Sequence, residues 1–425
     1  MSIYLADYLN QLPPGSAEHG EVLGAARALL DPRRGGKAVQ LRQVTNRVGV
    51  PTTFSAVTTS QFSRSWQISY VPIRKIKLGW ANWGVDTANS KGLGAGTETG
   101  PGGTMTISAS VEYPRGTFTQ LTWDNGATSG TIANGATGES DTVDLGFTLP
   151  PFRWFRIAVH AACPSGTWNM NFDNACDRAH GDEFAFGGAN NTMNATVAGT
   201  NTTSGMLPLY VLGQSDLGVW GIVGDSIASS QGEDGFPDPS GGRGILGRGL
   251  AQHGPHINYT TPGDLAQNFV LSHDKRIAAL VRGGVTRVID QYGSNDFNGG
   301  RTATQVLADK AAIRSYIPGL PWFECTTTPK TTGTFLTAAA QAVWDTAKNT
   351  QRVAHNNAIR AGIAGVENFV DAAGIVETSP GNEVGPVKDG GVWIGGLSKD
   401  GTHQTIRASL AVLPLFQGLL AAHGS

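Results

Sequence analysis

The chain has 425 residues, and this length predicts about two or three domains with at least one large core. Its 58 glycines and 21 prolines are typical of a loop-rich but folded protein. The 31 basic and 33 acidic residues give a net charge of -2, so the chain lacks the basic excess that binding to nucleic acid or to an anionic membrane surface requires.

No apolar run reaches the length of a transmembrane helix, and the N-terminus carries neither the basic nor the apolar region of a secretory signal. We therefore expect no membrane span, and the low charge and many glycines favour an extracellular or virion-associated setting. The three cysteines are too few for a disulfide framework or a zinc site. Buried thiols are the preferred interpretation, and a disulfide between Cys163 and Cys176 stays open. We expect no bound metal and no cofactor.

Residues 1–48 contain one amphipathic pattern, from Ala17 to Leu30, which Asp31 and Pro32 close. We interpret these residues as a helical leader or docking segment. Residues 49–205 then show short runs rich in Thr, Val, Ile and aromatic residues, separated by turn-forming residues. This texture predicts an antiparallel, jelly-roll-like β-sandwich with strands within Ser65–Val71, Gly103–Val111, Thr117–Trp123 and Phe152–His160.

Tryptophans in this region allow two interpretations. Their flat faces suit stacking on sugar rings, and their size equally suits a sandwich core, which is the preferred interpretation. The residues concerned are Trp80, Trp83, Trp123, Trp154 and Trp168. A carbohydrate-binding role for residues 49–205, and assembly into oligomers through these residues or the leader, are hypotheses.

Residues 206–425 alternate apolar strands with helical patterns, which predicts an α/β domain whose parallel sheet has helices on both faces. The expected strands are Gly218–Val223, His256–Tyr259, Thr286–Tyr292, Trp322–Thr327 and Glu367–Val370. The expected helices are Leu265–Val281, Ala303–Tyr316, Ala338–Ala361 and Thr405–Ala421.

Polar residues follow the carboxyl ends of the first three of these strands, at the edge where α/β sheets carry reactive sites. The first strand runs into Gly224, Asp225 and Ser226, so the Ser226 hydroxyl is a candidate nucleophile with its backbone N–H near a helix N-terminus. The third strand leads to Asn295, whose amide is a candidate donor to an oxyanion, and the second leads to Gly263, whose backbone N–H no side chain obstructs. Each signal alone also fits an ordinary cap or turn.

Asp400 and His403 stand just before the last expected helix. A serine hydroxyl needs a base to accept its proton, and the base works best when a carboxylate fixes its tautomer. The spacing of three residues allows Asp400 to reach Nδ1 of His403, which leaves Nε2 free for Ser226. We therefore predict that these three residues act together.

Four segments together resemble the conserved blocks of the GDSL or SGNH hydrolase family, over roughly residues 215–423: Gly224-Asp225-Ser226, Gly263, Gly293-Ser294-Asn295-Asp296 and Asp400-Gly401-Thr402-His403. The resemblance implies a flavodoxin-like, three-layer α/β/α fold and ester hydrolysis through an acyl-serine. It implies Ser226 as the nucleophile, His403 as the base and Asp400 as its orienting acid. It also implies an oxyanion hole formed by the backbone N–H groups of Ser226 and Gly263 and the amide of Asn295. The residues before Gly263 depart from the family pattern, so Asn258 is an alternative donor.

A β-sandwich joined to a serine esterase is similar to carbohydrate-active esterases, including deacetylases carried on phage tails. We therefore expect an esterase that removes acyl groups, above all acetyl, from an acylated polysaccharide or a small ester. The alternatives are a lipase or polyester hydrolase of the same family, and a glycan-binding adhesin or virion structural protein with an inactive hydrolase domain.

Three weaker signals point elsewhere. Residues 242–247 match a dinucleotide-binding pattern but follow a loop where that site needs a strand. His253 and His256 suit a metal site, although solvated loop histidines are preferred. An acidic loop suits a calcium site, although a solvated loop is preferred; its residues are Glu233, Asp234 and Asp238.

Overall fold

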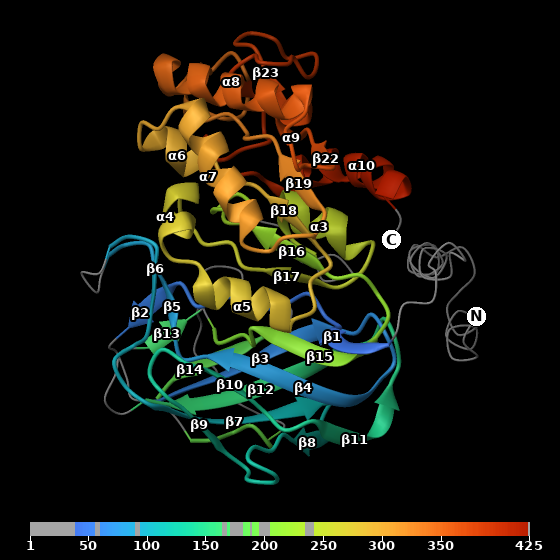
Figure 1. The fold of residues 1–425 in the computed structure, drawn as a ribbon. Helices are drawn as coiled ribbons and strands as arrows, with labels where there is room; N and C mark the ends of the chain where they lie inside the picture. Colours follow the sequence, from blue (N-terminus) through green and yellow to red (C-terminus); the bar gives the residue numbers. More distant parts are fainter. Residues whose placement is uncertain are drawn as a thin grey trace, which may run out of the picture.

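The computed structural model describes residues 39–55, 60–89, 94–163, 168–170, 182–187, 189–194, 205–233 and 242–423. The leader helix expected at residues 17–30, Cys176, and the acidic residues Asp234 and Asp238 lie outside these ranges. Figure 1 shows the antiparallel strands gathered at one end of the molecule and the parallel sheet with its helices at the other. None of the described helices combines the length and the hydropathy of a bilayer-spanning segment.

Two antiparallel sheets make up most of the first half. One has the order β14-β3-β12-β7-β8, with β9 beside β7, and comprises β14 (Glu183–Phe186), β3 (Ser60–Ile68), β12 (Trp154–Ala162), β7 (Met105–Glu112), β8 (Phe118–Gln120) and β9 (Gly130–Ile132). The other has the order β1-β15-β4-β10, with β11 beside β4, and comprises β1 (Gln40–Gln43), β15 (Tyr210–Ser215), β4 (Ile73–Ala81), β10 (Thr137–Glu139) and β11 (Val143–Leu149). Two small ladders accompany them: β2 (Thr53–Ser55) with β13 (Trp168–Met170), and β5 (Gly84–Asp86) with β6 (Thr97–Thr99).

Residues from both sheets share one apolar core. Trp80 and Trp83 are fully buried in it and Trp123 is 3% exposed, so these three rings are core residues and cannot stack on a sugar. Trp154 is half-buried against the edge of Trp66. The side chain of Trp168 lies outside the described part of the chain.

The strands that flank this half pair with each other. Gln40 to Gln43 of β1 pair antiparallel with Leu212 to Ser215 of β15, which also pairs with β4. The sequence predicts boundaries at residues 48 and 206, which would place β1 in the leader and β15 in the α/β domain. Backbone pairing instead joins both to the antiparallel sheet.

The second half contains a fully parallel sheet of the order β17-β16-β18-β19-β22, which is the flavodoxin-like order 2-1-3-4-5. Its strands are β16 (Trp220–Val223), β17 (His256–Asn258), β18 (Arg287–Asp290), β19 (Trp322–Cys325) and β22 (Asn368–Val370), each within a stretch expected to be a strand. Successive side chains alternate between two apolar clusters: Val288 packs with residues of α5 and α7, and Ile289 with residues of α3 and α10.

The helices that accompany this sheet are α3 (Gly244–Ala251), α4 (Ala266–Leu271), α5 (Asp274–Arg282), α6 (Ser294–Asn298), α7 (Ala303–Ser315), α8 (Thr346–Ala361), α9 (Ala372–Val376) and α10 (Ile406–His423). Short two-stranded ladders lie in the intervening loops: β20 (Thr331–Gly333) with β21 (Gln341–Val343), and β23 (Glu377–Thr378) with β24 (Val392–Trp393).

Three helix predictions need correction. The helix expected over 265–281 is broken at Ser272, which takes an extended backbone and whose hydroxyl accepts the N–H of Glu98 at 2.8 Å. The helix expected from Ala338 begins at Thr346, because residues 341–343 pair in a hairpin and Asp345 caps the helix. The α3 helix was not expected, since its sequence is rich in glycine; a Cβ at Gly249 would lie 2.2 Å from the Phe416 ring of α10, so glycine permits this close helix contact.

The two halves are joined through buried polar contacts. Arg276 of α5, which is fully buried, donates from Nε to Glu98 of β6 at 2.9 Å and from Nη1 to Asp264 at 2.8 Å. Glu98 also accepts the backbone N–H groups of Lys275 and Arg276 at the start of α5. A further cross-half bond runs from the Tyr259 hydroxyl to the carbonyl of Leu209 at 2.8 Å. The hairpin of β5 and β6 is therefore fixed to the α/β half by charge.

We expect Glu98→Gln to lower the free energy of unfolding by about 3 kcal/mol, because it leaves a buried guanidinium with one carboxylate in place of two. Urea denaturation followed by circular dichroism measures the change. Glu383→Gln, which removes an exposed carboxylate, is the matched control and should stay within about 0.5 kcal/mol of the parent. Equal midpoints for the two variants would contradict a stabilising role for this ion pair.

Candidate active site

The residues singled out in the sequence meet at the carboxyl edge of the parallel sheet. Ser226 lies two residues beyond Gly224, which follows the central strand β16. The loop after β17 is bound to this point, because the N–H of Thr261 donates to the carbonyl of Gly224 at 3.0 Å. The segment after β18 is bound there too, through the N–H of Gln291 and the carbonyl of Val223 at 3.0 Å.

Ser226, His403 and Asp400 form a continuous hydrogen-bonded chain. His403 Nε2 lies 3.0 Å from Ser226 Oγ, and His403 Nδ1 lies 2.6 Å from Asp400 Oδ2. The other carboxylate oxygen of Asp400 accepts the backbone N–H groups of Thr402 and His403 at 2.8 and 2.7 Å. Ser226 is 6% exposed and the His403 side chain 17% exposed, so both residues are largely shielded from solvent.

The two aspartates near Ser226 carry opposite pKa shifts. Burial works to raise the pKa of Asp400, but the hydrogen bonds from His403 and Thr402 outweigh it and hold that pKa below its ordinary value. Burial raises the pKa of Asp225 to about 6, against the N–H groups of Ile227 and Asn295 that favour its charged form. Asp400 is therefore the carboxylate that stays ionised beside the imidazole.

The two other candidate donors, Gly263 and Asn295, are tied to Ser226 through their neighbours. The N–H of Asn295 is one of the groups that lower the pKa of Asp225 against burial, and the Asn295 side-chain amide donates to the carbonyl of Asp264 at 3.1 Å. Asp264 directly follows Gly263, which turns the chain with φ of +82°, a conformation that favours glycine. Among the described residues, no hydrogen bond occupies the backbone N–H of Ser226 or of Gly263. The alternative donor Asn258 likewise uses one N–H of its amide, which donates to the carbonyl of Ala228 at 3.1 Å.

The backbone after Ser226 differs from the expected strand-to-helix turn. Hydrogen-bonded turns follow it, with the N–H of Ser229 donating to the carbonyl of Asp225 at 3.1 Å, and no helix occurs in the described residues 227–233. Any backbone stabilisation of negative charge near Ser226 therefore comes from the N–H groups of one turn and not from the dipole of a long helix.

Two glutamines hold this turn, and the sequence reasoning missed both. Gln291 Oε1 accepts the N–H of Ala228 at 3.0 Å, and Gln404 Nε2 donates to the carbonyl of Ile227 at 2.8 Å. The sequence offered one indication of each glutamine: Gln291 directly follows the strand β18, and Gln404 directly follows His403.

Within the described residues, the competing sequence signals form no metal or dinucleotide site. His256 is 3% exposed within β17, and burial lowers its pKa to about 3, so it is a core residue and not a solvated loop histidine. Glu233 is buried and paired with Arg248, with its Oε1 at 2.6 Å from Nε. No group of three or more metal-binding side chains occurs within the ranges that the structure describes. Residues 244–247 form the start of α3.

Cys163 and Cys325 are both buried. Burial raises the pKa of the Cys325 thiol, so this residue is unreactive at neutral pH.

The chain resembles several solved structures. A GDSL-like lipase from Bacteroides thetaiotaomicron matches at 13% identity and a TM-score of 0.33, over 48% of this chain and 88% of that chain. A carbohydrate acetylesterase from Sinorhizobium meliloti matches at 12% identity and a TM-score of 0.32, over 48% and 99%. A protein from Bacillus subtilis matches at 13% identity and a TM-score of 0.34, over 85% and 81%. No family model and no curated protein matches the sequence.

The pH dependence of stability should depend on Asp296, which is fully buried beside the site. Burial, together with the charges of Asp225 and Asp264, raises the pKa of Asp296 to about 7 in the folded protein. Its contribution to stability is therefore complete below pH 4 and is lost as the pH rises through 7, because the folded state must then ionise a buried acid. Asp296→Asn should thus gain in melting temperature relative to the parent between pH 4 and pH 8.

Thermal denaturation across that pH range measures the difference. Asp274→Asn, whose parent side chain is 97% exposed, is the matched control for loss of one carboxylate. A constant gap between Asp296→Asn and the parent at every pH would contradict the assignment.

Proposed function

We propose that this protein is a serine esterase that cleaves acyl esters through a covalent acyl-serine at Ser226, with His403 as general base and Asp400 as the carboxylate that orients it. The observation that carries the proposal is the 3.0 Å separation of His403 Nε2 and Ser226 Oγ, two residues 177 positions apart in the sequence. A hydroxyl, an imidazole and a carboxylate in this order are what activation of a serine at neutral pH requires.

In the proposed acylation step, Ser226 Oγ attacks the carbonyl carbon of the ester while its proton moves to His403 Nε2. The carbonyl π electrons move to oxygen, and their return expels the alcohol, which leaves with the proton from His403. Water then attacks the acyl-serine, gives its proton to His403, and releases the carboxylic acid as that proton returns to Ser226. Asp400 stays ionised throughout and stabilises the imidazolium, in agreement with its lowered pKa.

We assign stabilisation of the tetrahedral oxyanion to the backbone N–H groups of Ser226 and Gly263 and to the amide of Asn295. The support is connectivity: Asp264, which directly follows Gly263, accepts a hydrogen bond from the Asn295 amide through its carbonyl. One N–H of the Asn295 amide is used by Asp264, which leaves the other for substrate. Preorganised donors of this kind account for much of the rate acceleration of acyl transfer.

We further propose that the enzyme removes small acyl groups, above all acetyl, from a carbohydrate. The neighbouring pocket is lined mainly by polar and charged side chains, which favours a polar carrier over a lipid or polyester. In this proposal, the residues that follow β15 form a three-layer α/β/α domain of the SGNH type, preceded by a β-sandwich that includes β15. The alternative is an inactive, glycan-binding virion protein. Esterase activity would exclude this alternative, and its absence would favour it.

We expect the purified protein to hydrolyse p-nitrophenyl acetate faster than its longer-chain homologues, and Ser226→Ala to abolish this activity. Without Oγ no acyl-serine forms, and residual catalysis falls by about 10⁶-fold in kcat. A fluorophosphonate probe should label the parent and leave Ser226→Ala unlabelled.

Ser315→Ala, at an exposed helical serine, is the matched control and should retain full activity. Retained turnover in Ser226→Ala would remove this serine from the mechanism. Preference for long acyl chains would instead favour a lipase.

We expect Asn295→Ala to lower kcat by about 10²–10³-fold with little change in KM, because an oxyanion donor acts mainly in the transition state. Steady-state kinetics with p-nitrophenyl acetate measure both constants, and circular dichroism verifies folding. A rise in KM with unchanged kcat would assign Asn295 to ground-state binding.

A further inference from the structure

A second polar feature adjoins the candidate site. It is a small pocket of about 20 Å³, open to solvent, beyond the ends of β18 and β19. Its wall includes Ser294, Thr327, Lys330, Trp344, Lys348 and Arg352.

Chain connections place this pocket next to the proposed catalytic residues. Ser294 in its wall directly precedes Asn295. On the other side, Lys330 is followed by Thr331, whose N–H donates to the carbonyl of Gly401 at 2.9 Å, one residue beyond Asp400. Both sides of the pocket wall are thus continuous in the chain with, or hydrogen-bonded to, segments that carry the proposed catalytic residues.

Two ammonium groups are held at one aromatic ring in this wall. Lys330 Nζ lies 4.4 Å and Lys348 Nζ 4.3 Å from the ring centroid of Trp344, which is 39% exposed. These cation–π contacts fix two long side chains that would otherwise be mobile. Within the described residues, neither ammonium group has an acidic side chain in ion-pair contact, and Lys348 donates only to the carbonyl of Asn298 at 2.8 Å.

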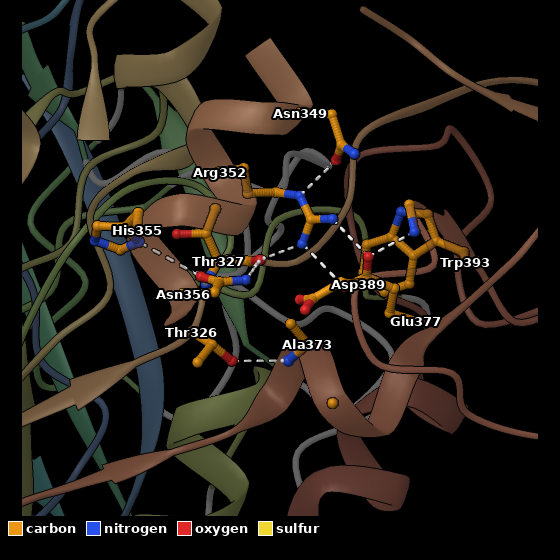
Figure 2. A network of polar contacts seen from close by, with 12 residues as sticks. Thr326, Thr327, Asn349, Arg352, His355, Asn356, Ala373, Glu377, Asp389 and Trp393 are labelled. Carbon is orange, nitrogen blue, oxygen red and sulfur yellow. Dashed lines mark hydrogen bonds and ion pairs between the residues drawn. The ribbon is translucent and has the colours of Figure 1, made fainter. Parts of the chain in front are cut away.

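The surrounding acidic groups are already occupied. Asp345 accepts the backbone N–H of Lys348 as the cap of α8, at 3.1 Å. Glu377 is engaged on both oxygens by Arg352, at 2.6 and 2.9 Å, as Figure 2 shows. Asp400 is bound to His403. Asp345 nevertheless shares the pocket wall, and the charge of Asp400 acts to raise the pKa of Lys330, so the positive charge of the two lysines is offset in part but not paired within the described residues.

The pocket also contains an unused polar group. Thr327 is 1% exposed, and among the described residues its hydroxyl has no hydrogen-bond partner, although its carbonyl accepts from Arg352 and Asn356 (Figure 2). Burial and the charge of Lys348 also lower the pKa of Lys330, which means that the two cations repel each other in the absence of an anion. A bound anion would relieve this repulsion.

We propose that the pocket binds an anionic substituent, a carboxylate or a sulfate, of the same glycan whose ester is cleaved at Ser226, with Lys330 and Lys348 as its charged contacts. This inference rests on the proposed esterase function for its catalytic half, and it makes the preferred substrate an acidic acylated polysaccharide. Lysine ammonium groups bind both oxyanions as point charges, so the shared negative charge is the recognised feature.

The first test measures binding without catalysis. Isothermal titration calorimetry at low salt compares oligogalacturonate, a sulfated oligosaccharide and a neutral xylo-oligosaccharide of equal length on the full chain. We expect at least one anionic ligand to bind about tenfold or more tightly than the neutral one, with affinity that falls as salt is added. The Lys330→Gln/Lys348→Gln double variant should lose this preference, and the Lys330→Arg/Lys348→Arg variant should keep most of it.

Lys75→Gln is the matched control, because it removes one exposed positive charge from β4 in the antiparallel sheet. Equal affinity for anionic and neutral ligands in the parent, or a preference that survives in the double glutamine variant, would overturn the inference. If only the sulfated ligand binds more tightly, sulfate is the recognised group. If only oligogalacturonate binds more tightly, carboxylate is the recognised group.

The second test measures catalysis. The ratio of kcat/KM for O-acetylated oligogalacturonate to that for O-acetylated xylo-oligosaccharide should fall about tenfold or more in the double glutamine variant. An anion preference in calorimetry together with no hydrolysis of any ester would overturn the proposed function and leave the binding site standing. Hydrolysis of both esters, with a kcat/KM ratio that the lysine substitutions leave unchanged, would support the proposed function and overturn the anion-binding site.

Discussion

The buried guanidinium of Arg276 is the contact on which the relation between the two halves depends. It binds Glu98 from the antiparallel half and Asp264 from the α/β half, and a charge taken out of water remains stable only while both carboxylates hold it. Asp264 in turn receives the hydroxyl of Tyr292 and, through its carbonyl, the amide of Asn295. A hairpin remote in sequence from the α/β half therefore helps to fix a candidate oxyanion donor.

The site residues could be predicted because parallel strands end at one common edge. The polar residues after β16 and β18 had to come close together, and the three-residue spacing of Asp400 and His403 allowed one orientation of the imidazole. Gln291 and Gln404 escaped prediction because a glutamine in a turn has no distinctive chemistry until its partner is known. Their partners, the N–H of Ala228 and the carbonyl of Ile227, are backbone groups that sequence does not single out.

The fold was predictable where periodicity is local and less so where contacts are distant. All five parallel strands fall inside expected stretches, since continuous apolar runs bounded by turns are a local signal. The α3 helix was not predicted because glycine disfavours helices, and the close contact with α10 that requires a glycine in α3 involves residues more than 150 positions away. Likewise β15 belongs by sequence position to the α/β half, but its hydrogen bonds go to β1 and β4.

The low exposure of Ser226 also limits how a polymeric substrate can approach it. In the proposed function, the cleaved ester projects from the polymer as a substituent, and this group must approach a residue that is 6% exposed. An enzyme of this shape would edit the decoration of a polymer and leave its length intact. Its effect on the surroundings would be a change in the solubility and stiffness of the material, with no loss of molecular mass beyond the trimmed groups.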